Sequence, residues 1–166
     1  MINKINSLSK SRFVEIFANV FENAGWIAEN LYEQKPFKDF QELSEKMLYI
    51  FINASDQNKL KILKSHPDLA DKTKVDLLTP ESNKEQNNAG LDQCTQIEFG
   101  EFKILNNKYK KKFGFPFIYA VRGKSKTEIL NNFKERVTCD INDEFVEATK
   151  QVKKIANLRM NEISKK

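Results

Sequence analysis

The only histidine of the chain, His66, lies in the segment Ser65-His66-Pro67-Asp68-Leu69-Ala70. Histidine has the unperturbed side-chain pKa nearest neutral pH, so it is the usual general acid or base of an enzyme. Because Pro67 ends any helix that arrives from its N-terminal side, we expect His66 at a helix end or in a turn. From there its imidazole can reach into a cleft. The alternative is a surface or helix-capping histidine without a chemical role.

A second group of polar side chains consists of Ser82, Glu85 and Gln86. On a helix these residues occupy positions i, i+3 and i+4, which places a hydroxyl, a carboxylate and an amide on one face. The alternative is structural, because Ser82-x-x-Glu85 is also the pattern of a capping box at the start of a helix. Taken alone, the pattern favours the capping interpretation.

The third candidate is Arg122, which ends the most apolar run of the chain, residues 114–123. By its pattern this run is a buried strand or an irregular core segment. An arginine that emerges from a buried stretch is costly unless its guanidinium meets an anion. Arg122 therefore predicts an anionic ligand or a structural salt bridge, for example to Asp68 or Glu85.

The elements that must position these residues read as amphipathic helices, because apolar residues recur every three or four positions. Gly25 breaks the first helix, and Thr95-x-x-Glu98 and Ser125-x-x-Glu128 are capping boxes. The predicted helices begin at or after Ser9 or Ser11, Trp26, Asp39, Asp56, Glu81, Thr95, Ser125, and Asn142 or Asp143. The helix after Asp56 delivers His66 at its end, and residues 67–80 are irregular. We predict an all-α fold of seven to nine helices in a single compact domain over residues 1–166.

Composition narrows the class of protein. Hydrophobic residues make up 40% and charged residues 31% of the chain, a balance typical of soluble globular proteins. A net charge of +5 indicates an anionic partner, which can be nucleic acid, a membrane surface or a small acidic substrate. One histidine with Cys94 and Cys139 cannot build a Cys/His metal site, so we expect none. Without a signal peptide or a membrane-length apolar run, we expect a cytoplasmic protein with no membrane partner.

Three motifs together resemble one family. They are His66-Pro67-Asp68-Leu69-Ala70, the run Leu78-Thr79-x-Glu81-Ser82-x-x-Glu85-Gln86-x-x-Ala89-Gly90-Leu91-Asp92, and the run Phe113-Gly114-Phe115-Pro116-Phe117-Ile118-x-Ala120-Val121-Arg122-Gly123. In order and spacing they resemble the 2-oxo-4-hydroxy-4-carboxy-5-ureidoimidazoline (OHCU) decarboxylases, which complete the route from urate to (S)-allantoin. The resemblance extends from Leu8 to Met160. One departure is Asp71, where family members often carry glycine.

The resemblance implies an all-α, cofactor-free enzyme that is commonly a homodimer and acts on a small anionic ureidoimidazoline. It assigns His66 as the catalytic acid or base, with Glu85 as its partner carboxylate. It further implies that Ser82, Gln86 and Arg122 bind the substrate, through its ureido and ring groups or its carboxylate. The residues implied to line the pocket are Pro67, Phe117, Ile118 and Val121.

These residue types also suit the reaction. Loss of CO2 leaves an electron pair that must be delocalised and then protonated from one face, and the substrate's own carbonyl and imine-type nitrogen can accept it. The protein then has to supply orientation, charge placement and a proton, without a metal or cofactor.

Two other classes of protein compete with this interpretation. One is a small basic helical module that binds nucleic acid. Against it, 23 acidic residues are interspersed among the lysines, and no helix-turn-helix or zinc pattern is present. The other is a helical interaction domain without activity, which leaves Arg122 and the Ser82, Glu85 and Gln86 face unexplained. We therefore expect no nucleic-acid partner.

Overall fold

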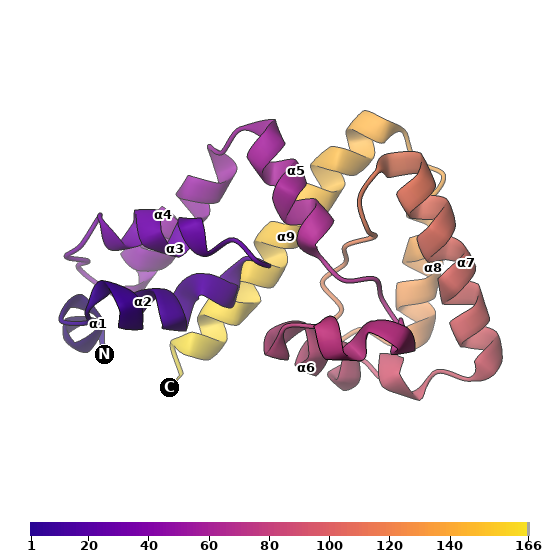
Figure 1. The fold of residues 1–166 in the computed structure, drawn as a ribbon, viewed down its shortest axis with the longest axis horizontal. Helices are drawn as coiled ribbons and strands as arrows, with labels where there is room; N and C mark the ends of the chain where they lie inside the picture. Colours follow the sequence, from indigo (N-terminus) through magenta and orange to yellow (C-terminus); the bar gives the residue numbers. More distant parts are fainter. Residues whose placement is uncertain (166) are drawn as a thin grey trace. The chain divides into compact units, whose positions relative to one another are not determined.

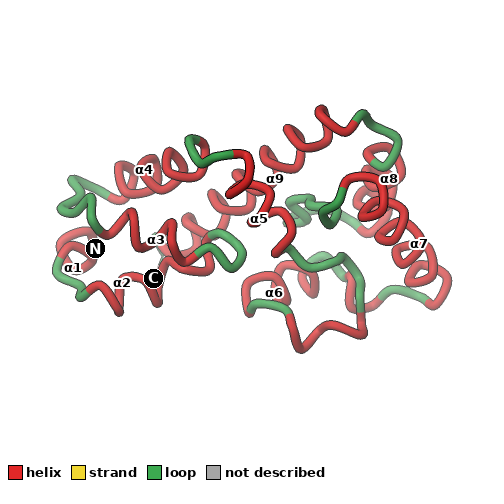
Figure 2. Tube along the Cα trace, turned by 45° about the horizontal axis from the view of Figure 1, so that its top comes forward, coloured by secondary structure: helices red, strands yellow, loops and turns green. Residues whose placement is uncertain are grey.

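A computed structural model describes residues 1–165, with the side chains of residues 72, 74 and 75 excepted. Within this range the chain forms nine α-helices and three short 3-10 helices, and no residue lies in a strand (Figures 1 and 2). The elements are α1 (Ile2–Asn6), α2 (Lys10–Phe17), η1 (Ala18–Val20), α3 (Gly25–Tyr32), α4 (Phe40–Ile52), α5 (Asp56–Ser65), η2 (Lys72–Leu77), α6 (Pro80–Asn88), η3 (Leu91–Gln93), α7 (Gln96–Phe113), α8 (Lys126–Arg136) and α9 (Ile141–Ile163). The predicted all-α class is confirmed. None of the described helices is long and apolar enough to cross a membrane.

Most helices begin where a short polar side chain precedes the first turn. Such a side chain accepts a hydrogen bond from a backbone N–H that the helix itself leaves without a partner. The residues in this role are Ser9, Asp39, Thr79, Thr95 and Ser125. The two predicted capping boxes, at Thr95 and Ser125, are both confirmed, since Glu98 and Glu128 return a bond to the cap.

The helices α3 and α6 start one residue before the predicted Trp26 and Glu81, and two predicted caps were wrong by one to three residues. Helix α5 is capped by Ser55 instead of Asp56, because the Ser55 hydroxyl accepts from the N–H of Asn58 at 3.2 Å. Helix α9 starts after Asp140, whose carboxylate accepts from the N–H of Asn142, so Asn142 already lies in the first turn. In both cases several neighbouring residues have side chains that suit a cap, and the backbone uses the earlier one. The short helix α1 had no prediction.

The chain divides into two compact units. The first consists of Met1–Ser65 together with the residues from Lys153 onward, and the second of His66–Val152. Helix α9 contributes to both. The single domain over residues 1–166 stays a prediction.

The core of the first unit is built from phenylalanines on helices that pack in sequence, α2 on α3 and α3 on α4. Phe13 and Phe17 lie with ring centroids 4.6 Å apart, and Phe21 and Phe51 lie 4.8 Å apart. A buried ion pair joins the two ends of this unit, with Arg159 Nη1 3.0 Å from Glu22 Oε2.

The core of the second unit surrounds the ring of Tyr109 on α7. Phe113, Phe117 and Phe133 all lie with ring centroids within 5.7 Å of the Tyr109 ring. Helices α7 and α8 pack together and lie side by side in both views (Figures 1 and 2). The apolar run between them is an irregular core segment, which resolves the alternative that the sequence left open.

Candidate active site

The segment that follows α5 holds the single histidine in a defined place. Helix α5 ends at Ser65, as predicted, and His66 is 8% exposed. Pro67 is half-buried. Ala70 has a φ of +55°, a left-handed conformation that is uncommon for a residue with a side chain. The surrounding structure must hold Ala70 there, since such a conformation costs free energy.

Gln86 of α6 supplies part of that hold. Its Oε1 accepts from the backbone N–H of Ala70 at 3.0 Å, and its Nε2 donates to the carbonyl of Asp68 at 3.2 Å. The buried side-chain amide of Gln86 thus bonds to two backbone groups of the segment after His66, one N–H and one carbonyl. The predicted contact of Gln86 with substrate stays a prediction. One N–H and one oxygen lone pair of its amide are left for such a contact.

Helix α7 holds the same segment from another side. Asn106 Nδ2 donates to the carbonyl of Leu69 at 2.9 Å, and Lys110 Nζ lies 2.6 Å from Asp68 Oδ2. Sequence reasoning missed Asn106 and Lys110. Their signal was helical spacing, because residues 99, 103, 106 and 110 lie on one face of the predicted helix.

The face of α6 carries the other polar candidates. Thr79 caps this helix and Pro80 is its first residue, so Ser82 lies inside the first turn. The interpretation of Ser82 as a capping residue was wrong, because its own N–H is the donor to the Thr79 hydroxyl at 3.3 Å. Ser82 and Gln86, four residues apart, are both buried, and Glu85 between them is half-buried.

The apolar run supplies the remaining pocket candidates, and polar side chains fix its backbone. Phe117, Ile118 and Val121 are buried, and Phe117 stacks on Phe133 with centroids 3.9 Å apart. Arg136 Nη1 donates to the carbonyl of Ile118 at 2.6 Å. The N–H of Ala120 donates to Gln151 Oε1 at 3.0 Å.

Arg136 belongs to a buried polar cluster that sequence reasoning missed. Its guanidinium pairs with Glu144, which also accepts from the Tyr109 hydroxyl, and it lies 4.6 Å from the centre of the Phe117 ring. Burial, with the hydrogen bond to Glu144, raises the pKa of Tyr109 above its usual range. The signal for Arg136 was its register, seven residues after Ile129 on the buried face of its helix.

Arg122 differs from what the sequence suggested. It is exposed, so the cost of a buried guanidinium does not apply to it; the buried arginines are Arg136 and Arg159. Gly123, which follows, has a φ of +74° and turns the chain away from the core. Arg122 therefore lies where the apolar segment reaches the surface of its unit.

The described residues contain no group of three or more histidine, cysteine, aspartate or glutamate side chains arranged to hold a metal ion. All nine predicted site residues belong to the second unit. Hydrogen bonds join the segment after His66 to α6, through Gln86. They also anchor the segment of Phe117 and Ile118 to α8 and α9.

Comparison with curated proteins gives long matches. The chain is 42% identical over 162 residues to the uric acid degradation bifunctional protein of Bacillus sp. (strain TB-90), a match that covers 98% of this chain and 32% of that protein. It thus spans about a third of that relative's length. It is 35% identical to the 2-oxo-4-hydroxy-4-carboxy-5-ureidoimidazoline decarboxylase of Halalkalicoccus jeotgali, over 98% of this chain and 91% of the relative. It is 37% identical to the putative decarboxylase of the same name from Homo sapiens, over 98% and 94%.

Solved structures agree with these relatives. A crystal structure of (S)-allantoin synthase matches with a TM-score of 0.77 and 26% identity, over 98% of this chain and 54% of that chain. An OHCU decarboxylase crystallised in the presence of (S)-allantoin matches with a TM-score of 0.71 and 27% identity, over 85% and 92%. The model of the OHCU decarboxylase family matches residues 6–161. The chain therefore belongs to the OHCU decarboxylase family.

Proposed function

We propose that this chain is a carboxy-lyase of urate degradation that converts OHCU to (S)-allantoin without a cofactor. The observation that carries the proposal is the extent of the match. Two relatives that bear the name of this decarboxylase are covered over 91% and 94% of their length. The chain therefore aligns with nearly the whole length of those two relatives.

In the proposed reaction, the bond between the ring carbon and its carboxylate breaks and CO2 leaves. The electron pair moves into the ring toward the imine-type nitrogen, which takes up a proton. The hydroxyl group on the same carbon loses its proton and becomes a carbonyl. The neighbouring carbon, which carries the ureido group, gains a proton on one face and becomes the stereocentre of (S)-allantoin.

His66 is the proposed acid or base of these proton transfers, a role typically worth about 10² to 10⁴-fold in rate. Its burial and the bonds to Asp68, Leu69 and Ala70 support this role, because a proton donor must be held in a constant position. Glu85 is the proposed partner carboxylate. It orients the imidazole and disfavours the ground state of the substrate by repulsion of the scissile carboxylate.

The remaining candidates are proposed to hold the substrate. Ser82 and Gln86 bind its ureido or ring groups from α6, and Arg122 binds its carboxylate with a planar pair of N–H donors. The backbone of the segment that contains Phe117, Ile118 and Val121 forms the wall of the pocket, together with Pro67.

The direct test uses freshly generated OHCU and circular dichroism. OHCU decays spontaneously to racemic allantoin, so the enzyme should produce an optical signal that uncatalysed decay does not. Turnover should also survive dialysis against a chelator. A decay that stays racemic and no faster with protein than without it contradicts the proposal.

We further propose that the chain acts in the cytosol as a homodimer and binds neither nucleic acid nor membranes. Two isoleucines support self-association. Ile97 and Ile104, seven residues apart on α7, are both strongly exposed and lie on one face of the helix, where a second copy of the chain can cover them. Light scattering should give twice the mass of 19.4 kDa, and Ile104→Lys should shift it toward the monomer.

A further inference from the structure

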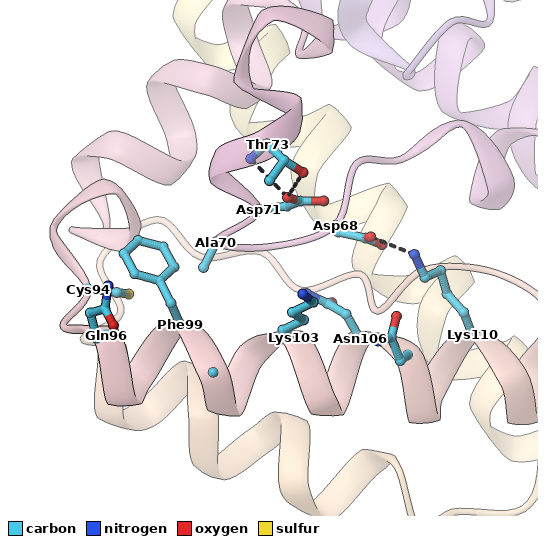
Figure 3. Close-up of a pocket in the computed structure, with 12 residues that line it drawn as sticks. Asp68, Ala70, Asp71, Thr73, Cys94, Gln96, Phe99, Lys103, Asn106 and Lys110 are labelled. Carbon is cyan, nitrogen blue, oxygen red and sulfur yellow. Dashed lines mark hydrogen bonds and ion pairs between the residues drawn. The ribbon is translucent and has the colours of Figure 1, made fainter.

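A cavity of about 570 Å³ lies in the second unit between α7 and the segment after His66. In Figure 3, Phe99, Lys103, Asn106 and Lys110 project from α7 toward Ala70 and its neighbours. None of the nine predicted catalytic or substrate-binding residues lines this cavity. Its volume falls in the range of small-molecule sites.

The cavity has a buried floor and a polar rim. Ala70, Cys94 and Asn106 form the floor and are all buried. Lys103 and Asn107 form part of the rim and are exposed. A concave site with a buried base can hold a small molecule, and the polar groups around it can fix the orientation of that molecule.

Gly100 keeps the α7 side of the cavity open. Glycine is among the least favourable residues inside a helix, so a packing reason usually accounts for it. Here a Cβ at position 100 would meet no atom within 4 Å. Packing therefore does not require the glycine. Because Gly100 has no side chain, space at the edge of the cavity stays open.

The two lysines of the cavity differ in their electrostatic state. Lys110 is neutralised by Asp68, to which it donates at 2.6 Å. Lys103 makes no ion pair within the part of the chain that the structure describes. The amides of Gln96 and Asn107 line the same cavity and can both donate and accept hydrogen bonds. The other acid of the described lining, Asp71, accepts from the N–H and the hydroxyl of Thr73. The cavity thus offers one lysine that makes no direct ion pair, beside amide groups.

We propose that this cavity binds a small carboxylate that also carries amide or ureido N–H groups. Lys103 pairs with the carboxylate, and the amides of Gln96 and Asn107 bind the N–H and carbonyl groups. The ligand also contacts Ala70, and Asn106 of the floor holds the carbonyl of Leu69. This inference rests on the proposed function. Because the cavity borders the segment after His66, a ligand in the cavity changes the rate of OHCU turnover without displacing the substrate.

The test measures binding directly and needs no turnover. N-carbamoylglycine, which combines a carboxylate with a ureido group, is titrated into the ¹⁵N-labelled protein and followed by NMR. We expect saturable shifts, weaker binding of acetate and of urea, and about tenfold weaker binding in Lys103→Met. Gly100→Leu, which places a bulky side chain at the edge of the cavity, should weaken binding. Gly100→Ala and Lys108→Met, on an exposed part of the same helix, should bind as the unaltered protein does.

Three results overturn the proposal. The first is the absence of saturable binding at millimolar N-carbamoylglycine. The second is an affinity that Lys103→Met leaves unchanged. The third is loss of binding in His66→Asn with full binding in Gly100→Leu, because the probe then occupies the proposed catalytic site. These binding measurements do not depend on decarboxylation. The ligand proposal and the proposed function can therefore fail independently of each other.

Discussion

Lys110 of α7 and Asp68, two residues after His66, form an ion pair with 2.6 Å between Nζ and Oδ2. The Asp68 side chain is only 8% exposed, whereas that of Lys110 is 35% exposed. The carboxylate is therefore largely removed from water, and loss of the lysine leaves a charge in a place of poor solvation. The pair ties the segment that carries His66 to a long, well-packed helix.

Lys110→Met should reduce kcat about tenfold, because the segment of His66 loses one of its attachments. The free energy of unfolding should fall by about 1 to 3 kcal/mol, the cost of removing one charged hydrogen-bond partner from a largely buried carboxylate. Steady-state kinetics and urea unfolding measure the two effects. Lys111→Met, on the exposed side of the same helix, is the control, and an equal loss of kcat there removes the assigned role of the pair.

His66→Asn should lower kcat by about two to four decades, the range of general acid–base catalysis. Asparagine keeps much of the side-chain volume, so the melting temperature should change little. The rate of appearance of optical activity is compared with the slow racemic decay. A folded variant that makes (S)-allantoin at nearly the original rate contradicts the role of His66. Racemic product from rapid decarboxylation restricts that role to protonation of carbon.

Arg122→Lys should raise KM more than it lowers kcat, because lysine keeps the charge but lacks the planar pair of donors. Since Arg122 is exposed, the variant should fold normally. Isothermal titration with allantoin measures the affinity directly, and Lys124→Arg serves as the control. Unchanged KM and allantoin affinity would assign Arg122 to the surface alone.

Gln151→Met should loosen the wall of the proposed pocket, because the N–H of Ala120 loses its acceptor. A fully buried donor without a partner costs about 1 to 3 kcal/mol, and the N–H of the half-buried Ala120 should lower the free energy of unfolding by no more than that. KM should rise as well, because the segment of Phe117 and Ile118 is less well ordered. Lys150→Met, its exposed neighbour, should change neither quantity. Lower stability with unchanged KM would limit Gln151 to a structural role.

Tyr109 should make the protein sensitive to alkali. Its pKa is raised in the folded state, mainly by burial, so its contribution to stability is complete below the ordinary tyrosine pKa near 10. Above that pH the unfolded chain ionises and the folded chain does not, and stability falls. Tyr109→Phe should therefore be less stable than the unaltered protein at pH 8, with a smaller difference at pH 11. Thermal melts at both values test this, and a constant difference contradicts it.

Helical class and most helix starts were predictable because both depend on local chemistry. A cap binds an amide three residues away, and apolar spacing is read within one helix. The shifted starts at Ser55 and Asp140 show the limit of this reasoning, since neighbouring polar residues compete for one cap. Nothing local distinguished a strand from an irregular segment in residues 114–123, because Arg136 and Gln151 decide where its backbone groups bond.

The residues of the candidate site were predictable from its motifs, but the hydrogen bonds that hold them in place were not. His66 and the face of Ser82 and Gln86 could be placed on a helix end and a helix from the sequence alone. The hydrogen bonds from the Gln86 amide to the backbone of Asp68 and Ala70 require α6 to lie close to the segment after His66. The spacing of residues in the sequence does not give distances between such segments. The exposure of Arg122 likewise depends on where its segment leaves the core.

The division of the chain has a consequence for the order of its synthesis. Glu22 leaves the ribosome 137 residues before Arg159, the partner with which it is buried. The residues Met1–Ser65 can therefore complete this pair only after α9 has been synthesised, whereas His66–Val152 leaves the ribosome before Arg159 does. Removal of one partner from such a pair costs about 3 to 5 kcal/mol, so Met1–Ser65 should be less stable in the nascent chain until Arg159 has emerged. Chaperones that bind the nascent chain before that point should bind Met1–Ser65.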